Sequence, residues 1–144
     1  MRWWLTPIAI LPFVPIQASA QSWYRVGGND RTYSYLDLES LAAKDGKVRA
    51  TLLSTYAHAI GDAKVSAAQV TVEYDCAGHS FRTIEYTYFG TARDVLGTEP
   101  SETIDQWKTP VAGSIDESSF KFACTRTGGT KVADPFSDGY FGQK

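Results

Sequence analysis

Two cysteines, Cys76 and Cys124, are the residues of this chain with the clearest capacity for chemistry. Their spacing lacks the C-x-x-C pattern of redox sites, and a zinc site needs more ligands than two thiolates. In an oxidising compartment these two thiols have only one intramolecular pairing. We therefore expect a structural disulfide between them, which in the chain-entropy model stabilises the fold by roughly 3–4 kcal/mol.

The two histidines, His58 and His79, fall near the ends of predicted strands. A metal site or a general base needs a second ligand or a partner acid at fixed geometry, and no such spacing accompanies either residue. We expect both on the surface or in turns. Asp75 directly precedes Cys76, where a carboxylate opposes thiolate formation. Asp75 is expected to accept N–H groups of a turn instead.

Glu73 and Glu85 fall on the polar faces of two adjacent predicted strands. Paired carboxylates could carry out acid–base catalysis. The alternative, which we favour, is that they face Arg82 or lysines on a solvated sheet face. The sequence motifs of serine hydrolases, zinc proteases, P-loop proteins and dinucleotide-binding proteins are absent. The sequence therefore predicts a protein that is not an enzyme and that uses no cofactor and no metal.

The first twenty residues have the pattern of a cleaved secretory signal peptide. Arg2 is followed by an apolar run over residues 3–16, and Ala18 and Ala20 form a small-x-small cleavage signal before Gln21. The run is too short and too rich in proline to span a membrane, and no later apolar run is long enough. Because no cysteine lies at the cleavage point to carry a lipid, we expect a soluble product in the periplasm or outside the cell.

The remaining chain has the composition of one ordered domain. Residues 21–126 are expected to form this domain, and the Gly/Asp-rich residues 127–144 a partly ordered tail. Hydrophobic residues make up 43% and charged residues 21% of the chain, as in globular proteins. With 14 basic and 16 acidic residues, the chain gives no electrostatic reason to bind nucleic acid or an anionic membrane.

Alternation of apolar and polar residues predicts strands over 23–26, 31–36, 48–58, 65–76 and 80–89. The first two would form a hairpin, and Asp37 would cap a single helical turn after it. Short connections make neighbouring strands antiparallel. In the last of these strands, the alternation places Tyr86 and Tyr88 on one face and Thr83 on the other.

Ser114 and Glu117 form an S-x-x-E capping box at the start of a predicted helix. The helix would run to about Cys124 and would place this cysteine beside the inner face of the sheet. Residues 90–110 read as a long polar loop with Trp107 as its anchor, and loops of this length are uncommon unless functional or mobile. The sequence thus predicts an α+β fold. A five- to six-stranded, mainly antiparallel sheet packs on a C-terminal helix with one disulfide.

Aromatic residues make up 13% of the chain, and most of them are expected in the core. Tyrosine is also favoured at interfaces, so a tyrosine-lined sheet face that binds a partner stays open. The tyrosines concerned are Tyr24, Tyr33, Tyr35, Tyr56, Tyr86 and Tyr88.

Residues spaced over nearly all of the mature chain resemble the surface-adhesin protein E family of Gram-negative bacteria. The matching residues are Trp23, Tyr35-Leu36-Asp37, Ser40-Leu41, Val48, Asp75-Cys76, Arg82, Gly90, Trp107, Pro110, Gly113-Ser114 and Cys124. The resemblance implies a sheet of about six strands on a C-terminal helix, closed by one disulfide. It also implies a protein that binds host matrix or serum proteins, such as vitronectin and laminin, and that forms a homodimer.

These observations lead to an exported, non-enzymatic, adhesin-like binding module that acts by protein–protein contact with a host matrix or envelope protein. Two alternatives stay open. The missing lipid-attachment cysteine favours a soluble periplasmic envelope or stress protein. A small-ligand binder would have its pocket between sheet and helix, roofed by residues 91–110. The basic stretch with which an adhesin would bind acidic ligands has no counterpart in the sequence, and no ligand-binding residue is assigned.

Overall fold

A computed structural model of the protein describes residues 20–140. The expected leader up to residue 19, with Ala18, and residues 141–144 lie outside the described residues. Within residues 20–140, the strands form one antiparallel sheet in the order β7-β6-β5-β4-β2-β1-β8, and β3 pairs with β4. The predicted sheet, C-terminal helix and disulfide are confirmed. The predicted number of strands is wrong, because the described residues form eight.

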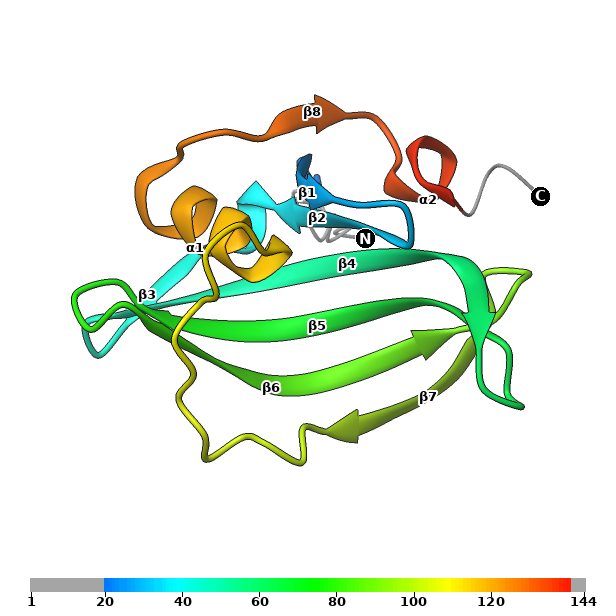
Figure 1. Ribbon diagram of the computed structural model, residues 1–144, viewed down its shortest axis with the longest axis horizontal. Helices are drawn as coiled ribbons and strands as arrows, with labels where there is room; N and C mark the ends of the chain where they lie inside the picture. Colours follow the sequence, from blue (N-terminus) through cyan, green and yellow to red (C-terminus); the bar gives the residue numbers. More distant parts are fainter. Residues whose placement is uncertain (1–19, 141–144) are drawn as a thin grey trace, which may run out of the picture.

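The strands are β1 (Trp23–Gly28), β2 (Thr32–Asp37), β3 (Ala42–Lys44), β4 (Lys47–Ile60), β5 (Val65–Asp75), β6 (Ser80–Phe89), β7 (Val95–Pro100) and β8 (Thr130–Val132). The helices are the 3-10 helix η1 (Leu38–Ser40), α1 (Ile115–Thr125) and α2 (Pro135–Asp138). Figure 1 shows α1 against one face of the sheet, with β8 and α2 beside β1 and β2. Neither α1 nor α2, the α-helices of residues 20–140, has the length and apolar character to cross a membrane.

The strands that sequence alternation does not predict are short or exposed. β7 lies within the predicted loop 90–110, and its Val95 and Leu96 are both exposed because β7 is an edge strand. With neither face of the strand buried, no alternation of polarity is needed. The segment expected to be a Gly/Asp-rich tail contributes β8 and α2 to the described structure. Three-residue strands such as β3 and β8 are too short to show a period of two.

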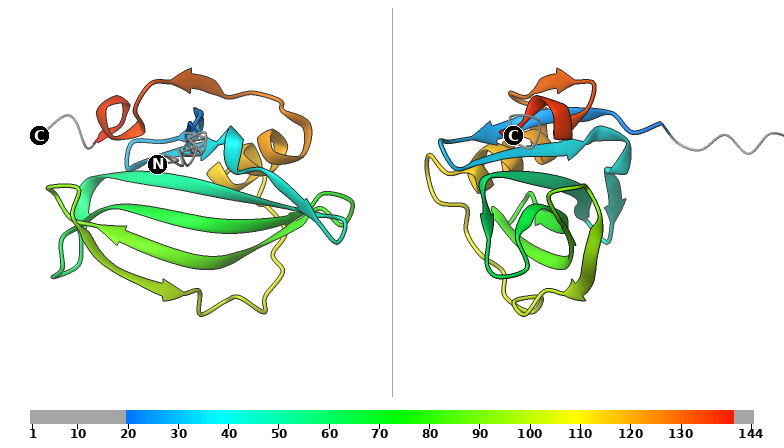
Figure 2. Two further views of the ribbon diagram at one scale, coloured as in Figure 1. Left: turned by 180° about the vertical axis from the view of Figure 1, so that it is seen from behind. Right: turned by 90° about the vertical axis from the view of Figure 1, so that its right-hand side faces the viewer.

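Each face of the sheet carries a core cluster, and different parts of the chain cover the two clusters. The right-hand view of Figure 2 shows the sheet strongly curled, and α1 packs on its inner face. There Phe120 and Phe122 join Leu36 and Leu52 in the larger core cluster. The residues that alternate with these leucines point to the outer face, where Tyr35 belongs to a second cluster covered by the C-terminal segment.

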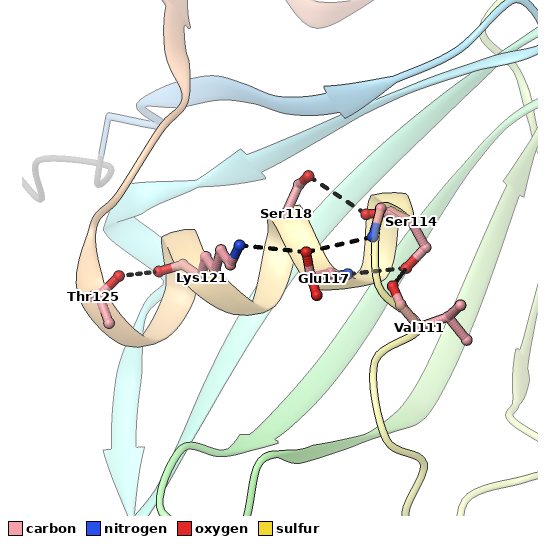
Figure 3. A network of polar contacts seen from close by, with 7 residues as sticks. Val111, Ser114, Glu117, Ser118, Lys121 and Thr125 are labelled. Atoms are coloured by element: carbon pink, nitrogen blue, oxygen red, sulfur yellow. Dashed lines mark hydrogen bonds and ion pairs between the residues drawn. The ribbon is translucent and has the colours of Figure 1, made fainter.

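Helix α1 is fixed at both ends. Ser114 Oγ accepts from the Glu117 N–H at 3.2 Å, and Glu117 Oε1 accepts from the Gly113 N–H at 3.4 Å, one residue before the N-cap (Figure 3). The predicted cap is therefore confirmed, with the reciprocal bond displaced by one residue. At the other end, Cys124 forms the disulfide with Cys76, with the two Cα atoms 5.7 Å apart. The bridge joins the last turn of α1 to the chain just after β5.

A β-bulge between β5 and β6 changes which residues of β6 face α1. Thr83 lies opposite Val72, but Glu85 lies opposite Thr71, so one extra residue of β6 is inserted between the two pairs. Thr83 therefore faces inward, on the same side as Tyr86, which lies opposite Val70. The prediction that Thr83 lies on the other face from Tyr86 is wrong because strict alternation does not hold across a bulge.

Candidate functional site

The histidines and Asp75 occupy the positions expected from the sequence. His58 and His79 are exposed, and the ring of His79 rests edge-on against Phe120, with centroids 4.8 Å apart. Asp75 Oδ1 accepts the Gly78 N–H at 2.9 Å in the β5–β6 turn. No group of three or more His, Cys, Asp or Glu residues that could hold a metal ion occurs within residues 20–140.

Glu73 and Glu85 are not brought together. Glu73 lies opposite Arg82, whereas Glu85 is exposed and lies opposite Thr71. Glu73 accepts hydrogen bonds from Arg82 Nη2 and from Arg49 Nε, each at 2.8 Å. The predicted partner Arg82 is confirmed. The expectation of a solvated face is wrong for Glu73, which is only 4% exposed because the two arginines cover its carboxylate.

The two guanidinium groups decide the charge state of Glu73. Burial alone would raise the pKa of this carboxyl, because a charge loses favourable hydration. The hydrogen bonds and charges of Arg49 and Arg82 outweigh burial and hold the pKa of Glu73 below its ordinary value. Glu73 is therefore an ionised link between Arg49 on β4 and Arg82 on β6.

Trp107 stands over this ion-pair row and is 39% exposed. Arg82 Cζ lies 4.9 Å and Lys47 Nζ 5.6 Å from the centroid of the Trp107 ring, within the range of cation–π attraction. The neighbouring residue is fixed to the sheet, because Lys108 and Phe81 exchange backbone hydrogen bonds of 2.8 and 2.9 Å. The ring is thus held at the surface by the sheet behind it.

We call this region the basic-aromatic face. It is a shallow groove of about 450 Å³ lined by Lys44, Asp45, Lys47, Arg49, Glu73, Arg82 and Trp107. Four basic and two acidic residues leave an excess of two positive charges in a chain whose net charge is −2. Sequence reasoning missed this face because its cations come from three strands, β3, β4 and β6. The closest signal was the group Lys44, Lys47 and Arg49.

The tyrosines do not form one common face. Tyr35 is fully buried and donates to Asp138, whereas Tyr33 stacks on Tyr140 with ring centroids 4.6 Å apart. Tyr24 packs against Phe122, and the Tyr88 hydroxyl donates to Glu99 Oε1 at 2.7 Å, which raises the pKa of Tyr88 to about 12. Tyr56 and Tyr86 line a cavity under α1.

This cavity has a volume of about 190 Å³ and lies between the first turns of α1 and the inner face of the sheet. Its walls come from Ser34, Leu52, Ser54, Tyr56, Val70, Val72, Tyr74, Phe81, Thr83, Tyr86, Ile115, Asp116 and Ser119. None of residues 91–110 contributes to the lining, so the expected roof is wrong. The helix itself covers the cavity, because Ser101 and Lys108 fix that loop to β6 at the sheet edge.

Comparison with known proteins identifies a family. Residues 23–125, from the first residue of β1 to the last of α1, match the family model of surface-adhesin protein E. No curated protein and no solved structure matches the chain. The match covers most of the chain and includes the disulfide and Trp107. The family suggests a non-enzymatic, adhesin-like protein that is exported or at the surface. The chain therefore belongs to the surface-adhesin protein E family.

Proposed function

We propose that this protein is an exported binding module without catalytic activity, and that it contacts a host matrix or envelope protein through the basic-aromatic face. The observation that carries the proposal is the exposed Trp107 ring held between Lys47 and Arg82. Membership of an adhesin family supports a role in binding. The basic-aromatic face supplies the surface that the sequence alone did not indicate.

Trp107 has the properties of a binding hot spot. Tryptophan and arginine are the residue types most enriched among positions that dominate binding energy. A side chain that is already held in place loses less conformational freedom when a partner arrives, so more of the contact energy appears as affinity. The cations beside the ring and the backbone bonds of Lys108 provide this preorganisation.

The charge of the basic-aromatic face indicates the chemistry of its partner. One carboxylate, Glu73, is shared by Arg49 and Arg82, so one guanidinium charge stays uncompensated. Lys44 and Lys47 add two positive charges and Asp45 offsets one, which leaves the excess of two. A partner segment that carries carboxylates and one apolar side chain would complement both the charge and the indole ring. We therefore expect an acidic segment of a protein as the ligand.

The proposal is tested by titrating the purified protein against immobilised vitronectin and laminin at low and high salt. Trp107→Ala should weaken binding by about tenfold or more, which is the loss typical of a hot-spot residue. Higher salt should weaken binding of the unchanged protein, because the attraction is between charges. Val111→Ala and Arg31→Ala, which remove an exposed apolar side chain and an exposed cation elsewhere, should leave the affinity unchanged.

Failure of the unchanged protein to bind either host protein would contradict the host role, and full affinity in the Trp107→Ala variant would contradict binding through the basic-aromatic face. Location separates the host role from the periplasmic alternative. Digestion of the domain by protease on intact cells would place it outside. Protection until lysis would direct the same titration to envelope proteins. Sedimentation of the purified protein tests the homodimer that the resemblance implies.

A further inference from the structure

The cavity under α1 combines an apolar floor with polar groups at its mouth. Leu52, Val70 and Val72 form the floor on β4 and β5, and Asp116 in the first turn of α1 reaches the cavity from above. The cavity measures about 190 Å³. An apolar cavity of about 150 Å³ is enough to accept a benzene ring in another protein. The space under α1 can therefore hold a compound with one ring.

Three tyrosines line this space, and their hydroxyls have no hydrogen-bond partner within residues 20–140. Tyr74 is only 2% exposed and lines the cavity, yet its hydroxyl makes no hydrogen bond to any residue in 20–140. The hydroxyls of Tyr56 and Tyr86 also have no hydrogen bond within this range. None of the three hydroxyls is among the fully buried polar atoms of residues 20–140 that lack a partner, so they are open to the cavity. An occupant of the cavity can therefore exchange hydrogen bonds with them.

Asp116 supplies a negative charge at the wall of the same cavity. Asp116 is an exposed residue, but partial loss of water around its carboxyl raises the pKa of Asp116, against the opposing effect of the Lys108 charge. Asp116 and Tyr74 both line the cavity, and the charge of Asp116 adds to the larger effect of burial in raising the pKa of Tyr74. No ion pair or hydrogen bond joins the Asp116 side chain to any residue in the described part of the chain.

An organic cation is the ligand that uses all of these groups. An ammonium ion is attracted to the faces of aromatic rings, which Tyr56, Tyr74, Tyr86 and Phe81 provide, and to a carboxylate. Its N–H groups can donate to tyrosine oxygens. A neutral alcohol would satisfy the hydroxyls but leave Asp116 unused, and an organic anion would be repelled by it. Only an organic cation pairs with the negative charge of Asp116 and also places its apolar part on the floor of the cavity.

We propose that the cavity under α1 binds a small organic ammonium compound, with the ammonium group between Asp116 and the tyrosine hydroxyls and one apolar ring on the floor. This site shares no lining residue with the basic-aromatic face. The inference is therefore independent of the proposed contact with a partner protein.

Benzylamine, benzyl alcohol and benzoate are three probes of the same size with positive, neutral and negative groups. Calorimetric titration of the full-length exported protein should show binding of benzylamine, about tenfold or more weaker binding of benzyl alcohol, and no binding of benzoate. Benzylamine should also raise the melting temperature with increasing concentration. Equal affinity for benzylamine and benzyl alcohol, or no binding of benzylamine, would overturn the proposal.

Asp116→Asn keeps the shape of the side chain and removes its charge. It should weaken benzylamine binding by about tenfold or more and leave benzyl alcohol binding unchanged, and the alcohol then reports that the cavity is still folded. Asp105→Asn, a change at an exposed aspartate outside the cavity, should have no effect. Trp107→Ala should bind benzylamine normally, which separates this site from the basic-aromatic face. Undiminished benzylamine binding in the Asp116→Asn variant would also overturn the proposal.

Discussion

The hydroxyl of Tyr35, a fully buried residue of β2, donates a 2.8 Å hydrogen bond to Asp138 Oδ2, at the end of α2. The same oxygen pairs with Arg25 Nη1 at 3.1 Å. Burial, and then the bond to Asp138, raises the pKa of Tyr35 far above its ordinary value, so the hydroxyl keeps its proton. This bond ties the C-terminal segment to the outer face of the sheet.

Asp138→Ala should therefore lower the free energy of unfolding by about 1–3 kcal/mol, because it leaves the buried Tyr35 hydroxyl without an acceptor. Adding Tyr35→Phe should cost less than the sum of the two single changes, since both polar groups are then gone. Urea unfolding measures each value. Asp62→Asn, at an exposed turn position, is the control and should match the unchanged protein. Strict additivity would show that the two groups do not interact.

Gly139 allows α2 to approach the sheet closely. A Cβ atom at this position would lie 2.3 Å from Thr55 Oγ1 and 2.7 Å from the Tyr35 hydroxyl, both on residues with no exposed surface. Gly139→Ala should cost about 1–3 kcal/mol as overpacking, seen as a lower urea midpoint. Gly97→Ala is the matched control, because its Cβ meets nothing within 4 Å. Equal midpoints for the two variants would contradict the close packing of α2.

Local signals in the sequence were sufficient for the central part of the fold. The long strands β4 and β5 show alternation because one face packs under α1, and the S-x-x-E pattern at Ser114 fixes the start of that helix. The edge strand β7 has no buried face, and the bulge that turns Thr83 inward depends on pairing with β5. These features depend on tertiary contacts, which cannot be predicted from the alternation of apolar and polar residues along a strand.

The same distinction applies to the candidate sites. The sequence paired Glu73 with Arg82 because cross-strand neighbours follow from strand order. It did not predict the burial of Glu73, since the covering groups come from β4, β6 and the segment that carries Trp107. The lining of the cavity likewise comes from α1, β2 and the three consecutive strands β4, β5 and β6, so it spans residues 34–119.

The disulfide should contribute a large part of the stability. Replacing both cysteines, Cys76→Ser with Cys124→Ser, should cost about 3–4 kcal/mol, because the bridge restricts the unfolded chain across a separation of 48 residues. Reductant should lower the melting temperature of the unchanged protein to that of the double variant. Reductant added to the double variant is the control and should change nothing. An unchanged melting temperature under reduction would contradict a stabilising bridge.

Export should remove the first twenty residues. The intact mass of the exported protein should correspond to a chain that begins at Gln21, because signal peptidase requires small residues at positions 18 and 20. Ala18→Leu with Ala20→Leu should leave an uncleaved precursor, whereas Ala9→Leu within the apolar run should be processed normally. A mature protein that retains Ala18 and Ala20 would contradict this cleavage site.

Glu73 should make stability depend on pH in acid. Its pKa in the folded protein lies below the ordinary value of 4.5, because the bonds and charges of Arg49 and Arg82 outweigh the effect of burial. The stabilisation is therefore fully present above pH 4.5 and is lost as the pH falls through the lower, folded-state pKa. At neutral pH, Glu73→Gln should cost about 1–3 kcal/mol, because glutamine has no negative charge and only one acceptor oxygen for the two arginines. Urea unfolding of both proteins across the acid range should show this difference shrinking as the pH falls. Glu85→Gln, at an exposed position, is the control. If the free energy of unfolding of Glu73→Gln differs from that of the unchanged protein by the same amount down to the lowest pH, the ion pair does not stabilise the fold.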